Sequence, residues 1–188
     1  MRIISGIFKG KKILEPKDIK TRPLKDLTKE SIFNIINHSN KFNINLNNST
    51  ILDIFSGVGS FGIECLSQGA KEVIFIEKYS GVLPILKKNL INLKSITNYE
   101  IIEEDVYSEN LFLKLNKKFD IIFLDPPYKD KNLDNLLKEI YNRKILKKNG
   151  IIILHRHKNE QDNFPSCYEL IEQKIYGISK IIFLSNLD

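Results

Sequence analysis

The chain has 188 residues, of which 42% are hydrophobic and 28% are charged, a composition typical of one soluble globular domain. No apolar run approaches the roughly 20 residues of a membrane span, and the N-terminus has no signal-peptide core, so we expect a cytoplasmic protein without a membrane partner. Cys65 and Cys167 lie far apart and lack metal-ligand spacing, which argues against a disulfide framework or zinc site, whereas the net charge of +6 favours an anionic partner.

The positive charge is concentrated near the N-terminus, although the whole chain is rich in lysine. Residues 1–30 contain nine basic and four acidic residues and so carry +5 of the net charge. They include Arg2 and Arg22, and arginine binds phosphate more specifically than lysine does. The pattern predicts a short hairpin that turns near Lys9 and Gly10, followed by an extended loop. We interpret this segment as a nucleic-acid surface, while a solvated basic arm without a partner stays open.

The basic side chains that we expect to contact a nucleic-acid substrate are Arg2, Lys9, Lys11, Lys12, Arg22 and Lys29. A helix is predicted after them, with Thr28 as its N-cap and with Ile32, Phe33 and Ile36 on its apolar face.

Strand-like and helical patterns alternate beyond an Asn-rich irregular loop. The expected strands cover residues 49–55, 72–77, 99–105, 119–125 and 150–156. The expected helices cover residues 60–68, 79–94, 108–116 and 133–146, with the second interrupted by Pro84. This alternation predicts an α/β fold with a parallel sheet and helices on both faces. Two final strand-like runs, 168–176 and 180–186, flank Gly177 and predict an antiparallel hairpin at the sheet edge.

A glycine-rich turn follows the first of these strands. Gly57, Gly59 and Gly62 match the pattern G-x-G-x-x-G between a strand and a helix, and Glu77 ends the next strand. Taken alone, the pattern fits a dinucleotide whose pyrophosphate lies on the turn. It fits S-adenosylmethionine equally, because that cofactor also has a ribose for the Glu77 carboxylate.

Three further residues belong to the expected cofactor site. Asp53 could help to accept a hydrogen bond from the ammonium group of S-adenosylmethionine, or it could be a structural carboxylate bound to loop amides. Asp105 ends the third strand and is a candidate for the adenine amino group or for a helix N-cap. Phe55 lies inside the glycine-rich turn.

The run 119–124, apolar except for Asp120, ends abruptly in Asp125, Pro126, Pro127 and Tyr128. Such a run is typical of a buried parallel strand whose carboxyl end opens into a site. A carboxylate and a backbone carbonyl held by stiff prolines can accept hydrogen bonds from a flat amine, and an aromatic ring can stack on a base. We therefore predict a pocket for an amine on a base, although two prolines after a strand often form only a turn.

These motifs together resemble a known enzyme family. LDIFSGVGSFGIE, followed by Glu77, Asp105 and DPPY, is similar to class I S-adenosylmethionine-dependent methyltransferases that act on amines. RIISG, KGKKI, TRP, LTKESIFNII and CLSQGA resemble more narrowly the RsmD-type family, which methylates the exocyclic N2 of a guanine in bacterial small-subunit (16S) ribosomal RNA. The resemblance covers nearly the whole chain. The chain departs from it at Ser5, where a second glycine is usual, and around His155, where an acid is common.

The resemblance implies a Rossmann-like, doubly wound sheet of seven mostly parallel strands with an antiparallel C-terminal hairpin. It divides the single domain 1–188 into a basic, RNA-contacting hairpin and helix extension (1–37) and a catalytic core (49–188). It also implies S-adenosyl-L-methionine as cofactor and the small ribosomal subunit or its 16S rRNA as partner. We expect no metal and a monomer. Asp125 and the Pro126 carbonyl would orient the amine, and Tyr128 would stack on the base. We assign no role to His155 or His157.

Four other functions stay open. A DNA adenine-N6 methyltransferase would use the same pocket but usually needs a larger target-recognition region. A protein glutamine methyltransferase also acts on a flat amine, yet it does not account for the basic N-terminus. A nicotinamide dehydrogenase shares the glycine-rich turn without a reason for Asp-Pro-Pro-Tyr. A noncatalytic RNA-binding module would explain the basic residues but not the cofactor residues.

Overall fold

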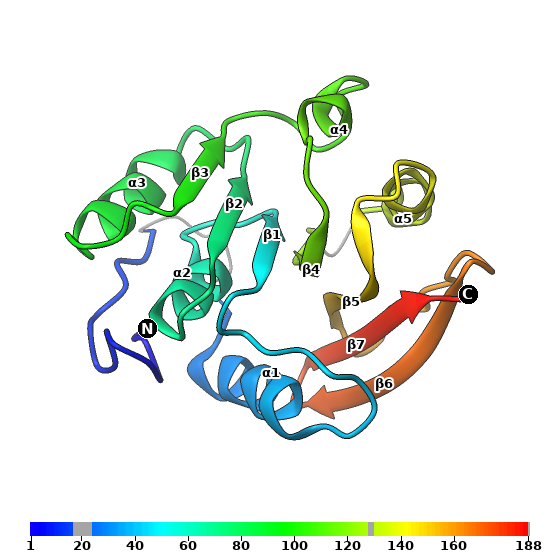
Figure 1. Ribbon diagram of the computed structural model, residues 1–188, viewed down its shortest axis with the longest axis horizontal. Coiled ribbons are helices and arrows are strands. Elements are labelled where there is room, and N and C mark those ends of the chain that lie inside the picture. Colours follow the sequence, from blue (N-terminus) through cyan, green and yellow to red (C-terminus); the bar gives the residue numbers. More distant parts are fainter. Residues whose placement is uncertain (17–23, 128–129, 188) are drawn as a thin grey trace.

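A single seven-stranded sheet, with strand order β3-β2-β1-β4-β5-β7-β6, runs through the computed structural model (Figure 1), which describes residues 1–16, 24–127 and 130–187. The strands are β1 (Thr50–Ile54), β2 (Glu72–Ile76), β3 (Tyr99–Ile102), β4 (Phe119–Leu124), β5 (Leu146–His157), β6 (Tyr168–Tyr176) and β7 (Ser179–Asn186). The helices are α1 (Asp26–His38), α2 (Ser60–Ser67), α3 (Leu83–Ile91), α4 (Leu111–Lys114) and α5 (Leu133–Asn142).

The direction of the strands confirms the predicted fold class. Strands β1 to β5 pair in parallel, whereas β7 pairs antiparallel with both β5 and β6. The strand order reverses direction between β1 and β4, and this switch point is where open α/β sheets bind their ligands. Among the described helices, none is long and apolar enough to cross a bilayer.

Each face of the sheet carries its own hydrophobic core. Successive strand residues point to opposite faces, so Ile51 of β1 belongs to one core and Leu52 to the other. Helices α1, α2 and α3 pack on the first face, and α4 and α5 pack on the second (Figure 1). Because both faces are covered, the central strands are nearly continuous apolar runs, such as residues 121–124 of β4.

Several of the predicted boundaries of helices and strands were wrong. Helix α1 begins at Asp26, so Thr28 is buried inside its first turn and is not its N-cap. Helix α3 is much shorter than the predicted 79–94, and Pro84 lies in its first turn, where proline costs little. Strand β5 begins at Leu146 rather than residue 150, because Leu146 pairs with Phe119 before a register shift.

The N-terminal extension forms the predicted hairpin in a reduced form. A single antiparallel bridge joins Arg2 to Lys12, and Gly10 turns the chain with a φ of 87°. Gly6 also has a positive φ, and a Cβ atom there would lie 1.8 Å from the carbonyl oxygen of Ser67. This close approach brings the extension against the end of α2 (Figure 1).

A buried carboxylate fixes the extension in place. Glu64 of α2 accepts hydrogen bonds from the backbone N–H groups of Ile4 and Ser5, each at 2.8 Å. Its Oε2 lies 3.4 Å from Nζ of Lys29, and both side chains are fully buried. Lys29 Nζ also donates to the carbonyl of Arg2 at 2.6 Å. Burial lowers the pKa of Lys29, and the carboxylates of Glu64 and Asp26 oppose that shift.

We expect Lys29→Met to lower the free energy of unfolding by about 3 to 5 kcal/mol, because it leaves the Glu64 carboxylate buried without a counter-charge. Urea unfolding measures the loss, and Lys25→Met, an exposed position one turn earlier, is the matched control. A loss below about 1 kcal/mol for Lys29→Met would show that this ion pair does not hold the extension.

Candidate functional site

The glycine-rich turn lies where β1 ends and α2 begins. Phe55, Gly57 and Gly59 all have positive φ, at 58°, 56° and 82°, so the backbone turns sharply within five residues. A Cβ atom on Gly57 would meet nothing within 4 Å, whereas one on Gly62 would lie 2.3 Å from the ring of Phe75. Gly62 is therefore needed for packing of α2 against the sheet, and Gly57 faces open space that a ligand can occupy.

Asp53 lies in β1 with 1% exposure, and its two oxygens differ in their surroundings. Oδ2 accepts a hydrogen bond from the N–H of Gly62 at 2.9 Å, whereas Oδ1 is buried without a hydrogen-bond partner. Burial raises the pKa of Asp53 well above 3.8, the Gly62 hydrogen bond opposes this, and the charges of Asp125 and Glu77 raise it further. The structural interpretation of Asp53 thus holds for one oxygen and leaves the other available to a donor.

Glu77 follows β2 and binds the turn from the neighbouring strand. Its Oε2 accepts a hydrogen bond from the N–H of Gly57 at 2.8 Å, and its Oε1 accepts from the N–H groups of Lys78 and Tyr79 at 2.9 and 2.8 Å. The carboxylate is partly exposed. It therefore holds the shape of the turn and also presents oxygen atoms at the open edge of the sheet.

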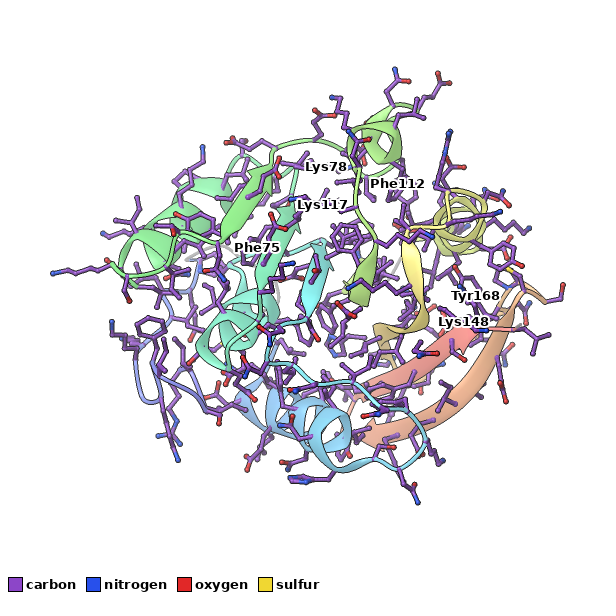
Figure 2. All side chains as sticks on the ribbon, in the orientation of Figure 1. Phe75, Lys78, Phe112, Lys117, Lys148 and Tyr168 are labelled. Atoms are coloured by element: carbon purple, nitrogen blue, oxygen red, sulfur yellow. The ribbon has the colours of Figure 1, made fainter. Side chains whose placement is uncertain are left out.

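Asp105 lies beyond the end of β3 and contacts Lys78, which is labelled in Figure 2. Its Oδ2 is 2.8 Å from Lys78 Nζ, and its Oδ1 accepts a hydrogen bond from the N–H of Tyr107 at 3.1 Å. The N-cap position of α4 is Asn110, so Asp105 is not the cap of that helix. Partial burial raises the pKa of Asp105, and the bonds from Lys78 and Tyr107 outweigh it, so the net shift is downward.

Asp125 and Pro126 lie immediately after β4, next to the end of β1. The Asp125 N–H donates to the carbonyl of Ile54 at 3.3 Å, which extends the pairing of the two strands by one residue. The Asp125 side chain is 20% exposed, Pro126 is buried and Pro127 is exposed. The predicted stacking residue, Tyr128, lies outside the described residues.

Two contacts around this site were not anticipated from the sequence. The ring of His155, at the carboxyl end of β5, lies with Nδ1 2.8 Å from Oδ1 of Asp125. The hydroxyl of Tyr107 is 2.9 Å from both carboxylate oxygens of Asp130. The adjacent strand ends could have indicated the first contact, since the fifth strand was expected to end at residue 156.

The basic residues of the extension divide into two groups. Arg2, Lys9, Lys11 and Lys12 are exposed, and Arg2 and Lys9 line a surface hollow of about 420 Å³. Arg22 lies outside the described residues. The prediction for Lys29 was wrong, because its ammonium group is buried against Glu64 and cannot reach a phosphate.

Among the described residues, no three His, Cys, Asp or Glu side chains are grouped to hold a metal ion.

The chain is similar to several known proteins. Residues 1–185 match the model of a family described as Conserved hypothetical protein 95. A Haemophilus influenzae protein named ribosomal RNA small subunit methyltransferase D is 33% identical over 182 residues, which cover 95% of this chain and 90% of the relative. The crystal structure of a candidate methylase from Haemophilus influenzae is 33% identical, with a TM-score of 0.74 and coverage of 100% and 98%. A candidate methyltransferase from Escherichia coli, 24% identical, shares the fold with a TM-score of 0.82 over 99% and 97% of the two chains.

We expect the free energy of unfolding of Asp53→Asn, relative to that of the parent, to increase as the pH rises above 3.8. Because burial raises the folded-state pKa of Asp53, this group's contribution to the free energy of unfolding is full in acid and is lost as the pH rises through that pKa. The asparagine variant lacks this loss. Urea unfolding of both proteins from about pH 4 to about pH 8 checks the trend.

Asp134→Asn, an exposed change on α5, provides the control for general charge effects. A difference between Asp53→Asn and the parent that does not change with pH would contradict the elevated pKa.

Proposed function

The chain belongs to the family described as Conserved hypothetical protein 95, and we propose that it transfers a methyl group from S-adenosylmethionine to the exocyclic N2 of a guanine in 16S ribosomal RNA. One observation carries the proposal: the Asp125 carboxylate and the Pro126 backbone lie beside the end of β1, where the glycine-rich turn begins. The relative named ribosomal RNA small subunit methyltransferase D supports rRNA as the substrate.

The residues around the turn fit S-adenosylmethionine. The space above Gly57 is free, and Oδ1 of Asp53 is buried without a donor, so an ammonium group can bind there directly or through water. Glu77 presents a carboxylate for the ribose hydroxyls, and Asp105 lies where an adenine amino group can be bound if Lys78 moves aside. Phe55 and the turn backbone complete the expected cofactor site.

The cofactor supplies an electrophilic sulfonium methyl group, and the protein must present a weakly nucleophilic amine to it. The lone pair of an exocyclic guanine amine is delocalised into the ring. Asp125 and the Pro126 carbonyl can each accept one N–H of that amine, which aims the nitrogen and stabilises positive charge as it develops. Tyr128 stacks on the base, which must leave its stack or already lie in a loop. The product nitrogen then loses a proton to solvent.

The N-terminal extension binds the RNA backbone. Arg2, Lys9, Lys11 and Lys12 are exposed on one short segment, and phosphate contacts are the main source of nucleic-acid affinity. Residues 1–37 thus act as the RNA-contacting extension of the catalytic core 49–188. Glu64 joins the two parts rigidly, so RNA held by the extension is placed relative to the turn.

Labelled S-adenosylmethionine tests the proposal directly. The parent protein is incubated with small ribosomal subunits, free 16S rRNA, duplex DNA or a peptide release factor, and the labelled nucleoside is identified after digestion. We expect N2-methylguanosine from the subunit or the rRNA. Label in DNA adenine or in glutamine would establish one of the alternative activities, and binding of RNA without transfer would indicate a noncatalytic module.

Asp125→Ala should reduce single-turnover methyl transfer about a hundredfold or more, because it removes a preorganised electrostatic group at the reacting nitrogen. Affinity for S-adenosylhomocysteine, measured by calorimetry, should stay close to that of the parent. Asp130→Ala is the matched control, since it removes a nearby carboxylate that binds Tyr107. Turnover of Asp125→Ala within a few fold of the parent would show that another group orients the amine.

Replacing Arg2, Lys9, Lys11 and Lys12 by alanine should weaken RNA binding and flatten its salt dependence. Each lost phosphate contact should reduce the slope of log K against log salt by roughly 0.7 to 0.9. Binding titrations at several salt concentrations measure the slope, and cofactor affinity should not change.

The control has the same charge change at exposed lysines elsewhere: Lys87, Lys114, Lys117 and Lys138 are replaced by alanine. Equal slopes of log K against log salt for the two quadruple variants would exclude the extension as the RNA-binding surface.

A further inference from the structure

We propose that His155 is a positioning residue for methyl transfer, because it holds the Asp125 carboxylate in the orientation that receives the target amine. This inference rests on the proposed function of Asp125. No pattern in the sequence indicates a role for His155, and the contact follows only from the pairing of β4 with β5.

Strand register brings the two side chains together. Leu124 of β4 pairs with Leu154 of β5, so Asp125 and His155 are the next residues at the same edge of the sheet. Their side chains meet with Nδ1 of His155 2.8 Å from Oδ1 of Asp125. On the other side of the ring, Nε2 lies 2.9 Å from Oγ of Ser179 at the start of β7.

The partners define the direction of these hydrogen bonds. An ionised carboxylate can only accept, so the proton of the contact with Asp125 lies on Nδ1 of His155. In a neutral ring Nε2 then accepts from the Ser179 hydroxyl, and in a charged ring it donates to the same oxygen. Either form directs an N–H at Asp125, and the buried ring, with its side chain 8% exposed, has a partner on both nitrogens.

The contact has two consequences for the chemistry. It occupies one carboxylate oxygen and fixes the plane of the group, so that Oδ2 is the oxygen left for the amine. It also leaves the proton of the contact on His155, so the Asp125 carboxylate remains a hydrogen-bond acceptor for the amine. A misplacement of about 1 Å near a reacting group can cost about a hundredfold in rate. The restraint on the Asp125 carboxylate should therefore affect the rate of methyl transfer.

Kinetics of two substitutions test the role. His155→Leu removes the N–H and should lower the single-turnover rate about ten- to a hundredfold, with the KM for small subunits and the affinity for S-adenosylhomocysteine within about twofold of the parent. His155→Asn can return an amide N–H to the place of Nδ1 and should recover most of the rate. His157→Leu, on the same strand, is the control and should leave the rate unchanged.

A combination of variants separates positioning from a general structural effect. Because His155 acts through Asp125, His155→Leu should cause no further loss of rate in the Asp125→Ala background. An additive loss, no rescue by asparagine, or a parent-like rate in a folded His155→Leu protein would overturn the proposal.

Nitrogen NMR of the imidazole rings tests the contact without any methyl transfer. The chain has only three histidines, so ¹⁵N spectra of the rings can be assigned by substitution. We expect a protonated Nδ1 on His155 whose resonance shifts in Asp125→Ala, and an unprotonated Nδ1 would overturn the proposal. If the parent fails to methylate any RNA while this signature is present, the proposed function fails and the contact stands.

Discussion

The buried carboxylate of Glu64 is the interaction on which the placement of the N-terminal extension against the sheet and its helices depends. It lies on α2, the helix that follows the glycine-rich turn, and it binds the backbone of Ile4 and Ser5 together with the ammonium of Lys29. A buried carboxylate without these partners would be strongly unfavourable, so the extension and α1 must dock where they do. The helix that follows the glycine-rich turn therefore also holds the basic extension in place.

The acidic and the basic side chains lie in different parts of the molecule, and each group suits one of the two proposed ligands, the cofactor and the RNA. Asp53, Glu77 and Asp125 converge at the carboxyl edge of the sheet, and the charges of the latter two raise the pKa of Asp53. An acidic edge of this kind suits the sulfonium and ammonium groups of the proposed cofactor. The exposed cations Arg2, Lys9, Lys11 and Lys12 lie instead on the extension, where an RNA backbone can be bound without entering the acidic site.

The sequence predicted those features that are encoded locally. Apolar runs such as 119–124 identified the buried strands, and glycine spacing identified the turn, because backbone conformation restricts residue choice at those positions. It failed where partners come from distant segments. Lys29 reads as one more surface lysine until Glu64, thirty-five residues later, is seen against it. Composition cannot distinguish a buried lysine from an exposed one, and only the fold supplies the partner.

The antiparallel hairpin of β6 and β7 also contributes a side chain to the proposed site. As part of the hairpin at the sheet edge, β7 would only need to pair with β5 and β6 and complete the sheet. Its first residue, Ser179, however, contacts Nε2 of His155, while Nδ1 of that ring holds Asp125. The side chains of three strand ends therefore form one chain of hydrogen bonds that reaches the proposed amine pocket. In this arrangement the reversed strand is needed, because a β7 parallel to β5 would begin at the opposite edge of the sheet and could not bring its first residue to His155.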